Sequence, residues 1–258
     1  MITDVEKKKF LSESYFTRKL SMDMTEIDRA VDLAWEHMQE MNPWLVRDDP
    51  STWVGDITDS CRVAGNAKRR GRIKLRECVQ KEPFLQEMVY GNSEITSIIH
   101  ALLGPKGSPR TSHRGLYPIV PSLTSSNHLQ GGMDAHPFQV SCIIYLSDVT
   151  EDGGAFILWK GSHRIMQDTF PGKASWEMSK PKAEELRLIA EDKCERVFIP
   201  GEIGTAVFWH HRTLHTPGTN RTQNVRHALI ADFLQSDWES KQDLPHEDDI
   251  WADWAISE

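Results

Sequence analysis

Cysteine is scarce in this chain. Only four of the 258 residues are cysteines, Cys61, Cys78, Cys142 and Cys194, and no two are spaced as Cys-x-x-Cys. Close pairing and that spacing are typical of disulfide frameworks and redox motifs, so the sequence predicts neither. Cys142 lies inside an apolar run, where a buried, reduced thiol is the usual state. The cysteine content fits a reducing cytoplasm, which is the location that we expect.

Long apolar runs are also missing. No stretch approaches the roughly twenty apolar residues that a membrane-spanning helix requires. Residues 1–10 contain Asp4, Glu6 and three lysines, which is not the composition of a secretory signal peptide. We therefore expect a protein that does not enter a membrane.

Positive charge is the third deficit. The chain has 30 Lys and Arg against 38 Asp and Glu, a formal net charge of −8. This balance disfavours non-specific binding to nucleic acid or to an anionic membrane. The basic cluster at residues 68–74 is the exception, and we interpret it as a solvated loop or helix start. With 39% hydrophobic residues and nine Trp, the chain can build a core and is not expected to be disordered.

The first 110 residues have the pattern of a helical region. The clearest signal is at residues 24–41, where apolar residues from Ile27 to Met38 recur at helical spacing, Thr25 can cap the start and Pro43 ends the helix. Further helices are expected at residues 4–20, 73–90 and 93–103, with a packed loop at residues 43–72.

The pattern changes at about residue 114. Short β-rich runs separated by turn residues follow, at 114–120, 138–147, 155–159, 195–199, 204–210 and 226–234. Several short strands with turn signals indicate an all-β sandwich or barrel. Helices followed by strands indicate that the helices pack on one side of it. Residues 165–193 form a long insertion with an expected helix at 181–191, and long insertions often serve as lids.

Two segments combine metal-binding side chains with strands. Asp134 and His136 stand two residues apart just before an apolar run, and alternate strand side chains point the same way. His215 follows a second apolar run. Two histidines and one carboxylate that converge from different strands, with coordination positions left open, are the ligand set of non-haem Fe(II) oxygenases. We therefore predict a metal site at Asp134, His136 and His215.

The same segments belong to a series of motifs that occur in the order of a known family. The motifs are Arg114-Gly-Leu-Tyr-Pro118, Asp134-Ala-His-Pro-Phe138, Tyr145-Leu-Ser-Asp-Val149, Gly153-Gly154, Gly161-Ser-His-Arg164, Gly201-Glu-Ile-Gly204, His215 and Arg226. With them, roughly residues 110–235 resemble the phytanoyl-CoA dioxygenase family. The likeness is specific because the motifs recur in order.

This resemblance implies a fold. It predicts a mainly β protein with helices, in which a double-stranded β-helix (a jelly roll, or cupin-like core) is supported by N-terminal helices. We expect a single domain over residues 1–258, as a monomer or a homodimer. Residues 1–110 would be mainly helical support and loop, residues 111–235 the jelly-roll core with the insertion at 165–193, and residues 236–258 a C-terminal tail.

The resemblance also implies a reaction. Family members are dioxygenases that use Fe(II), 2-oxoglutarate and O2, here to oxidise a small molecule. Asp134 and His215 match the family's metal ligands and would have a catalytic role. Arg226 matches the residue that pairs with the distal carboxylate of 2-oxoglutarate. Thr216 and Arg114 are expected to contribute to cofactor binding.

One position departs from the family pattern. The family's first ligand, a histidine two residues before the aspartate, falls on Gly132. His136 is then one candidate for the third donor. His128 is another, because an alternative register makes His128-Leu-Gln130 the motif and puts Gln130 in place of the carboxylate. A member that has lost this histidine, and is non-catalytic or has altered chemistry, is the alternative function.

Arg226 has an alternative interpretation too. A buried arginine among apolar neighbours needs a partner, because an unpaired buried charge is unfavourable. That partner is either the carboxylate of a ligand, as the resemblance implies, or an internal carboxylate such as Asp232 or Glu202. Arg221 is a second candidate for the anion-binding arginine, from a turn.

Overall fold

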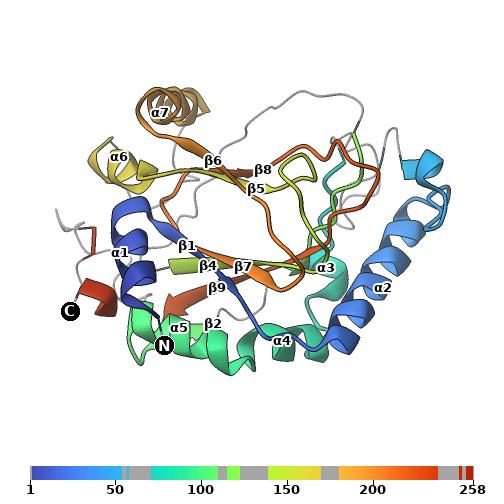
Figure 1. Cartoon of the computed structure of the whole chain (residues 1–258), viewed down its shortest axis with the longest axis horizontal. Helices are drawn as coiled ribbons and strands as arrows, with labels where there is room; N and C mark the ends of the chain where they lie inside the picture. The colour runs from blue at the N-terminus through green and yellow to red at the C-terminus, as the bar shows by residue number, and fades with distance from the viewer. Residues whose placement is uncertain are drawn as a thin grey trace.

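The protein is described here from a computed structural model. The structure describes residues 2–53, 57, 71–109, 115–122, 139–169, 180–237, 250–251 and 254–257, and every structural statement below concerns these residues. Their strands form two antiparallel sheets that lie face to face, with helices on the outer sides of both (Figure 1).

The larger sheet has six strands in the order β1-β7-β4-β9-β2, and β3 pairs with β9. Its strands are β1 Tyr15–Lys19, β2 Gly107–Pro109, β3 Gly115–Leu116, β4 Gln139–Tyr145, β7 Thr205–His210 and β9 Ala228–Gln235. Strands that are neighbours in this sheet are often far apart in the sequence. The sheet therefore depends on contacts between distant parts of the chain.

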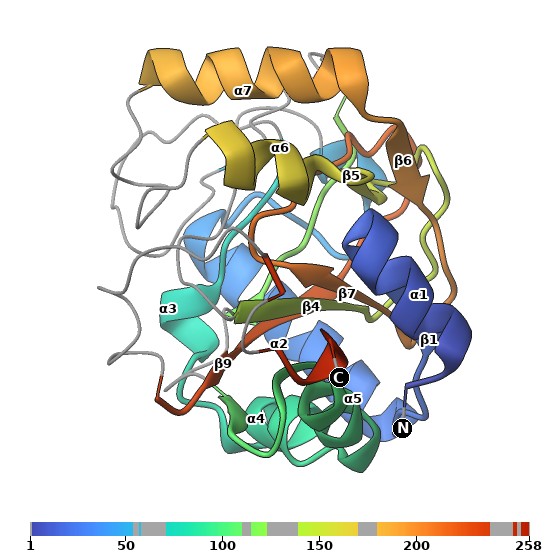
Figure 2. The ribbon, with the colours of Figure 1, turned by 90° about the vertical axis from the view of Figure 1, so that its left-hand side faces the viewer.

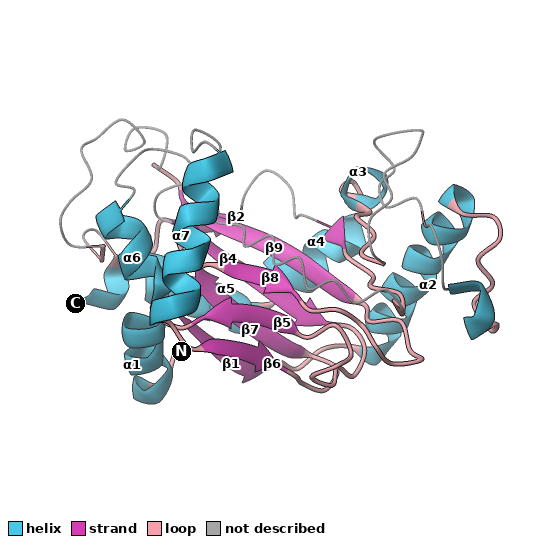
Figure 3. Ribbon diagram, turned by 90° about the horizontal axis from the view of Figure 1, so that it is seen from above, coloured by secondary structure: helices cyan, strands magenta, loops and turns pink. Residues whose placement is uncertain are grey.

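The smaller sheet has three strands, with β5 (Phe156–Trp159) between β6 (Arg196–Ile199) and β8 (His215–Pro217). Viewed from above, these strands lie over the larger sheet (Figure 3). The described strands form an open sandwich of two sheets and not a closed barrel, which is the arrangement expected for a jelly-roll-like core with added helices.

Helices cover both outer faces. The helices are α1 Asp4–Glu13, α2 Met24–Met41, η1 Pro50–Trp53, α3 Arg76–Val79, α4 Pro83–Tyr90, α5 Ser93–Leu103, α6 Ser162–Thr169, α7 Lys180–Lys193 and η3 Ala255–Ser257. Figure 2 shows α4 and α5 on one side of the larger sheet, and α6 and α7 on the side of the smaller sheet. None of the described helices has both the length and the apolar composition that crossing a bilayer requires.

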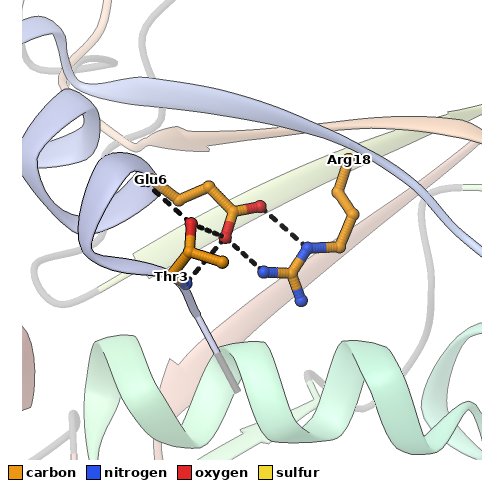
Figure 4. A network of polar contacts seen from close by, with 3 residues as sticks. All are labelled: Thr3, Glu6 and Arg18. Carbon is orange, nitrogen blue, oxygen red and sulfur yellow. Dashed lines mark hydrogen bonds and ion pairs between the residues drawn. The ribbon is translucent and has the colours of Figure 1, made fainter.

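Local side-chain bonds fix the N-terminal elements. Thr3 and Glu6 form a capping box at the start of α1, which satisfies backbone N–H groups that have no partner inside the helix. Glu6 also accepts a 2.8 Å hydrogen bond from Arg18 Nε of β1 and pairs with that guanidinium (Figure 4). Burial alone would raise the pKa of Glu6, but the bonds from Arg18 and Thr3 outweigh burial, and the net pKa is lowered. This network ties α1 to the edge of the larger sheet.

Alternation along the strands divides the core in two. Tyr145 of β4 and Ala228 of β9 point toward the smaller sheet and pack with Phe156 of β5. Cys142 and Phe208, on the opposite face, join the larger core under the helices. Because residues two apart share a face, the space between the sheets is lined by odd-numbered residues of β4 and β7 and even-numbered residues of β9.

The mainly β fold with N-terminal helices is confirmed, but some element predictions are wrong. The helix expected at residues 4–20 ends at Glu13. Ser14 then has a left-handed φ of 70°. β1 follows, pairs with β7 and buries Tyr15 and Phe16 on opposite faces of the larger sheet. The helix expected at 73–90 is divided into α3 and α4, since proline at position 83 begins a new helix rather than continuing one.

Other expectations have mixed outcomes. Cys142 is a buried free thiol, as predicted. Cys78 is disulfide-bonded, which the spacing of the cysteines did not predict. The helix expected at 181–191 is present as α7. The division of residues 1–258 into support, core and tail stays a prediction.

Candidate active site

His215 lies in the space between the two sheets. It begins β8 and pairs with Leu158 of β5. Its ring packs at 5.4 Å from the ring of Phe156 and at 5.1 Å from that of Trp209, measured between centroids. These two aromatic rings are themselves 4.6 Å apart. The imidazole is therefore held against an aromatic wall built from both sheets.

A backbone carbonyl orients the His215 imidazole. The Nδ1 atom of His215 lies 2.8 Å from the carbonyl oxygen of Thr213. A carbonyl oxygen can only accept, so Nδ1 donates this bond, and in the neutral ring the lone pair then lies on Nε2. Metal-binding histidines usually have this kind of bond on the ring nitrogen that does not bind the metal. The predicted role of His215 as a metal ligand would use Nε2, which this bond leaves available on the ring.

Arg226 precedes β9 and is 2% exposed. Its Nη1 donates to the carbonyl oxygen of Gly154 at 3.2 Å, and its Nη2 donates to that of Tyr117 at 2.9 Å. Its Nε is buried without a hydrogen-bond partner among the described residues. Burial lowers the pKa of Arg226 to about 10, the nearby Tyr145 counteracts this, and Arg72 adds to it. At neutral pH the group remains a cation.

The internal salt bridges considered for Arg226 do not form. Asp232 accepts a 2.8 Å hydrogen bond from the hydroxyl of Ser141, and Glu202 pairs with Lys19 at the surface. Carbonyl oxygens orient the Arg226 guanidinium but carry no net charge to balance it. A buried cation in this situation is expected to be stabilised by a bound anion.

Tyr145 locks the two sheets together beside these residues. Its buried hydroxyl donates to the carbonyl oxygen of Ile199 at 2.6 Å and accepts from the backbone N–H of Phe156 at 2.9 Å. Burial raises the pKa of Tyr145, and the charge of Arg226 opposes that rise. The sequence analysis did not single out Tyr145 as a site residue, because its role depends on strands that are distant in sequence.

The structure separates Thr216 from this site. Thr216 pairs with Ile157, whose side chain packs in a small core with Ala190 of α7. Paired residues lie on the same face of a sheet, so Thr216 points to the outer face of the smaller sheet, opposite to His215. We do not retain it in the proposed cofactor site.

Other predicted site residues belong to segments that the structure does not describe. Asp134, His136 and Arg114 lie outside the described residues, as do the alternatives at positions 128, 130 and 132. In the part of the chain that is described, no three His, Cys, Asp or Glu side chains are grouped so that they could hold a metal ion. Of the three predicted metal ligands, His215 is the one that lies among the described residues.

The neighbouring histidines face another part of the molecule. His210 is buried on the helix side of β7, with its ring centroid 4.8 Å from that of Trp254 and 5.7 Å from that of His163. His163, at the start of α6, is 5.4 Å from Trp251. These rings dock the C-terminal segment and do not share the face of His215.

A family comparison decides the classification. The family model described as phytanoyl-CoA dioxygenase (PhyH) matches residues 82–228, which is more than half of the chain. The chain belongs to the phytanoyl-CoA dioxygenase family. The resemblance drawn from the motifs is thereby confirmed. A "Probable phytanoyl-CoA dioxygenase" from Caenorhabditis elegans is 23% identical over 154 residues, which cover 55% of this chain and 48% of that protein. The match thus spans about half of the curated relative.

Solved structures share the fold. The "non-heme alpha ketoglutarate dependent carbocyclase SnoK from nogalamycin biosynthesis" superposes with a TM-score of 0.60 at 18% identity, covering 95% of this chain and 93% of that one. EctD from S. alaskensis, with 2-oxoglutarate and 5-hydroxyectoine, gives 0.58 at 13% identity, covering 92% and 77%. At such low identities these likenesses concern the fold.

Proposed function

We propose that this protein is an Fe(II)- and 2-oxoglutarate-dependent oxygenase that oxidises a small molecule with O2. Membership in the phytanoyl-CoA dioxygenase family supports the cofactor pair, and proteins of similar fold are described with iron or 2-oxoglutarate. The observation that carries the proposal is Arg226, a buried guanidinium with no carboxylate partner among the described residues.

Arg226 would bind the distal carboxylate of 2-oxoglutarate. A planar guanidinium matches a carboxylate in geometry and charge. Its two terminal nitrogens are fixed by Gly154 and Tyr117, and its Nε is buried without a partner in the described part of the chain. An anion at this place would supply the missing acceptor and balance the charge.

His215 would hold the iron through Nε2, together with Asp134 from the segment that precedes β4. The Thr213 carbonyl keeps the His215 ring in the required tautomer. We assign the third position to His136, because it is two residues from Asp134 and extended backbone places both on one face. His128 and a site without a third protein donor are the alternatives that experiment must separate.

Iron, 2-oxoglutarate and O2 supply the oxidising power when they are bound, and the protein supplies orientation and exclusion of water. Phe156 and Trp209 form an apolar wall against His215. Tyr145 holds β5 on β4 and so keeps that wall in place. We assign the oxidation to the hydroxylase type.

An anaerobic titration tests the proposal. Iron and 2-oxoglutarate together should give a visible metal-to-ligand charge-transfer band in the wild-type protein. Absence of the band at saturating iron would favour a non-catalytic binding protein on the same scaffold. Iron titration of His136→Ala, His128→Ala and Gly132→His then assigns the third donor. Loss of iron binding in His136→Ala alone supports our assignment, whereas a gain of affinity in Gly132→His indicates a site that lacks one ligand.

A further inference from the structure

Trp209 carries a buried hydrogen-bond donor that has not yet been given a role. Its indole ring belongs to the core between the two sheets, and the residue is 1% exposed. The indole nitrogen Nε1 is buried and has no hydrogen-bond acceptor among the described residues. Buried indole N–H groups usually have a partner, because an unsatisfied buried donor destabilises the folded state. This donor is therefore suited to an acceptor that a bound molecule supplies.

The polar neighbours of Trp209 in the larger sheet do not supply that acceptor. The strand register places Trp209 in one row with Tyr15 of β1, Ser141 of β4 and Asp232 of β9, and paired residues lie on the same face. The Ser141 hydroxyl donates to Asp232 at 2.8 Å. Asp232 is itself two strands away from Trp209, roughly 10 Å across the sheet. The other side chains of this core are mainly apolar or aromatic.

Trp209 lies beside the predicted metal ligand His215. The centroid of its ring is 5.1 Å from that of His215 and 4.6 Å from that of Phe156. In the proposed function, Nε2 of His215 binds the metal, and a divalent metal lies about 2 Å from the imidazole nitrogen that holds it. A molecule bound to that metal would therefore share the space beside the His215 ring with the indole of Trp209.

Arg226 lies farther along the same space between the sheets. Its Nη1 donates to the carbonyl oxygen of Gly154 at 3.2 Å. Leu158, which pairs with His215, is four residues beyond Gly154, roughly 13 Å along an extended strand. A 2-oxoglutarate molecule whose distal carboxylate binds Arg226 would extend from there toward His215. Its 2-oxo acid end would then arrive where the N–H of Trp209 is buried.

We propose that the indole N–H of Trp209 donates a hydrogen bond to the carboxylate at the 2-oxo acid end of 2-oxoglutarate. Indole can only donate, and an ionised carboxylate can only accept. A bond to an ionised acceptor is stronger than one between neutral groups. Trp209 and Arg226 would hold opposite ends of one molecule and so fix the orientation of its 2-oxo acid relative to His215. The proposal rests on the proposed function in one respect, namely that 2-oxoglutarate binds at Arg226.

The NMR signal of the Trp209 indole N–H reports this bond directly. Protein with nitrogen-15 in its tryptophan side chains is titrated with 2-oxoglutarate, with and without Zn(II), which is redox-inert, in place of iron. The Trp209 signal, assigned by its absence in Trp209→Phe, should move downfield. 2-Oxovalerate, which keeps the 2-oxo acid end, should move it too, whereas 4-oxobutanoate, which keeps the distal carboxylate and has an aldehyde in place of the oxo acid, should not. The signal of Trp53, whose Nε1 already donates to the Val46 carbonyl at 2.8 Å, should stay in place.

A replacement that keeps the ring measures the contribution of the bond to affinity. Exchanging Trp209 for 3-benzothienylalanine puts sulfur in place of the N–H and preserves the packing, so it also serves if Trp209→Phe does not fold. Calorimetric titration should show that 2-oxoglutarate binds this variant at least tenfold more weakly, as expected for the loss of a bond to a charged group. Metal affinity should change little. The same exchange at Trp53, which packs against Trp35 in the other core, is the matched control and should bind 2-oxoglutarate as the wild type does.

Several outcomes would overturn the proposal. These are a Trp209 signal that stays in place while 2-oxoglutarate binds, an equal shift with 4-oxobutanoate, and equal affinity of the wild type and the benzothienyl variant. In each case a charge-transfer band in the wild type would leave the oxygenase function standing. If the wild type forms no such band with iron, but 2-oxoglutarate moves the Trp209 signal and binds the benzothienyl variant more weakly, the role of Trp209 stands and the oxygenase function fails. A wild type that does not bind 2-oxoglutarate would overturn both.

Discussion

Replacing Arg226 with methionine tests the anion site most directly. The change removes the cation and keeps a side chain of similar length in a position that is 2% exposed. In the structure, Arg226 has one nitrogen without a partner among the described residues and two that hold carbonyl oxygens. At least one charge-assisted hydrogen bond to 2-oxoglutarate should then be lost, which contributes roughly 1.5–3 kcal/mol, or about one to two decades in affinity.

The assay measures the affinities for iron and for 2-oxoglutarate under anaerobic conditions. It also compares 2-oxoglutarate with 2-oxovalerate as the co-substrate. The charge-transfer band gives the affinity for 2-oxoglutarate, and a separate titration gives the affinity for iron. Wild type should also prefer 2-oxoglutarate over 2-oxovalerate, which lacks the distal carboxylate, by a similar factor. Arg226→Met should lose that preference because both molecules then make the same contacts. Iron affinity should change little.

Arg221 provides the matched control. It lies at the surface and its Nη1 is 3.3 Å from Asp152, so Arg221→Met removes an arginine from the same part of the chain without emptying the inner face. It should bind both co-substrates as the wild type does. An equal loss of iron and 2-oxoglutarate affinity in Arg226→Met, or a retained preference for 2-oxoglutarate, would show that Arg226 is structural and that the reasoning is wrong.

His215→Ala should abolish iron binding in a titration, because few donors remain; stoichiometric iron in this variant would remove His215 from the site. Asp134→Ala should lose activity while Gln130→Ala keeps it, measured as succinate formed from 2-oxoglutarate with O2 present, and the reverse result would establish the alternative register. Burial, with the charge of Arg164 adding to it, lowers the pKa of His163 to about 3. Because this folded-state pKa lies below the ordinary 6.5, the stability from neutral His163 is complete above pH 6.5 and declines as the pH falls below it. Urea unfolding should therefore show that the wild type loses about 1.6 kcal/mol more free energy of unfolding than His163→Gln between pH 6.5 and 5. Equal losses in the two proteins would contradict the lowered pKa of His163.

Local signals predicted the parts of the fold that depend on neighbours in sequence. The helical spacing at residues 24–41 predicted α2 with the same bounds that the structure has. The β1 strand was missed because it is short, and its pairing with β7 involves residues about 190 positions later. From local propensity alone, the five residues Tyr15–Lys19 are interpreted as a continuation of the helix. Their partner strand β7 is distant in the sequence, so it does not enter such an argument.

The residues of the candidate site were likewise predicted only in part from the sequence. His215 and Arg226 were found from motifs, and the structure gives them an oriented imidazole and a buried guanidinium. Thr216 was expected to contribute to cofactor binding, but alternation along β8 turns its side chain to the other face. Asp232 entered the sequence analysis only as a possible partner of Arg226. Its position on the inner face depends on the register of three strands.

The pairing of β1 with β7 also bears on how the chain reaches its fold. Ser14 accepts a hydrogen bond from Thr213, 199 residues later in the sequence. Such distant contacts form slowly, because a long loop must close before they can contribute. During synthesis, Tyr15 and Phe16 are made long before the strand that buries them, and they remain exposed until residue 210 has emerged. The edge of the larger sheet should therefore be among the last parts to assemble, and the step most dependent on protection from aggregation.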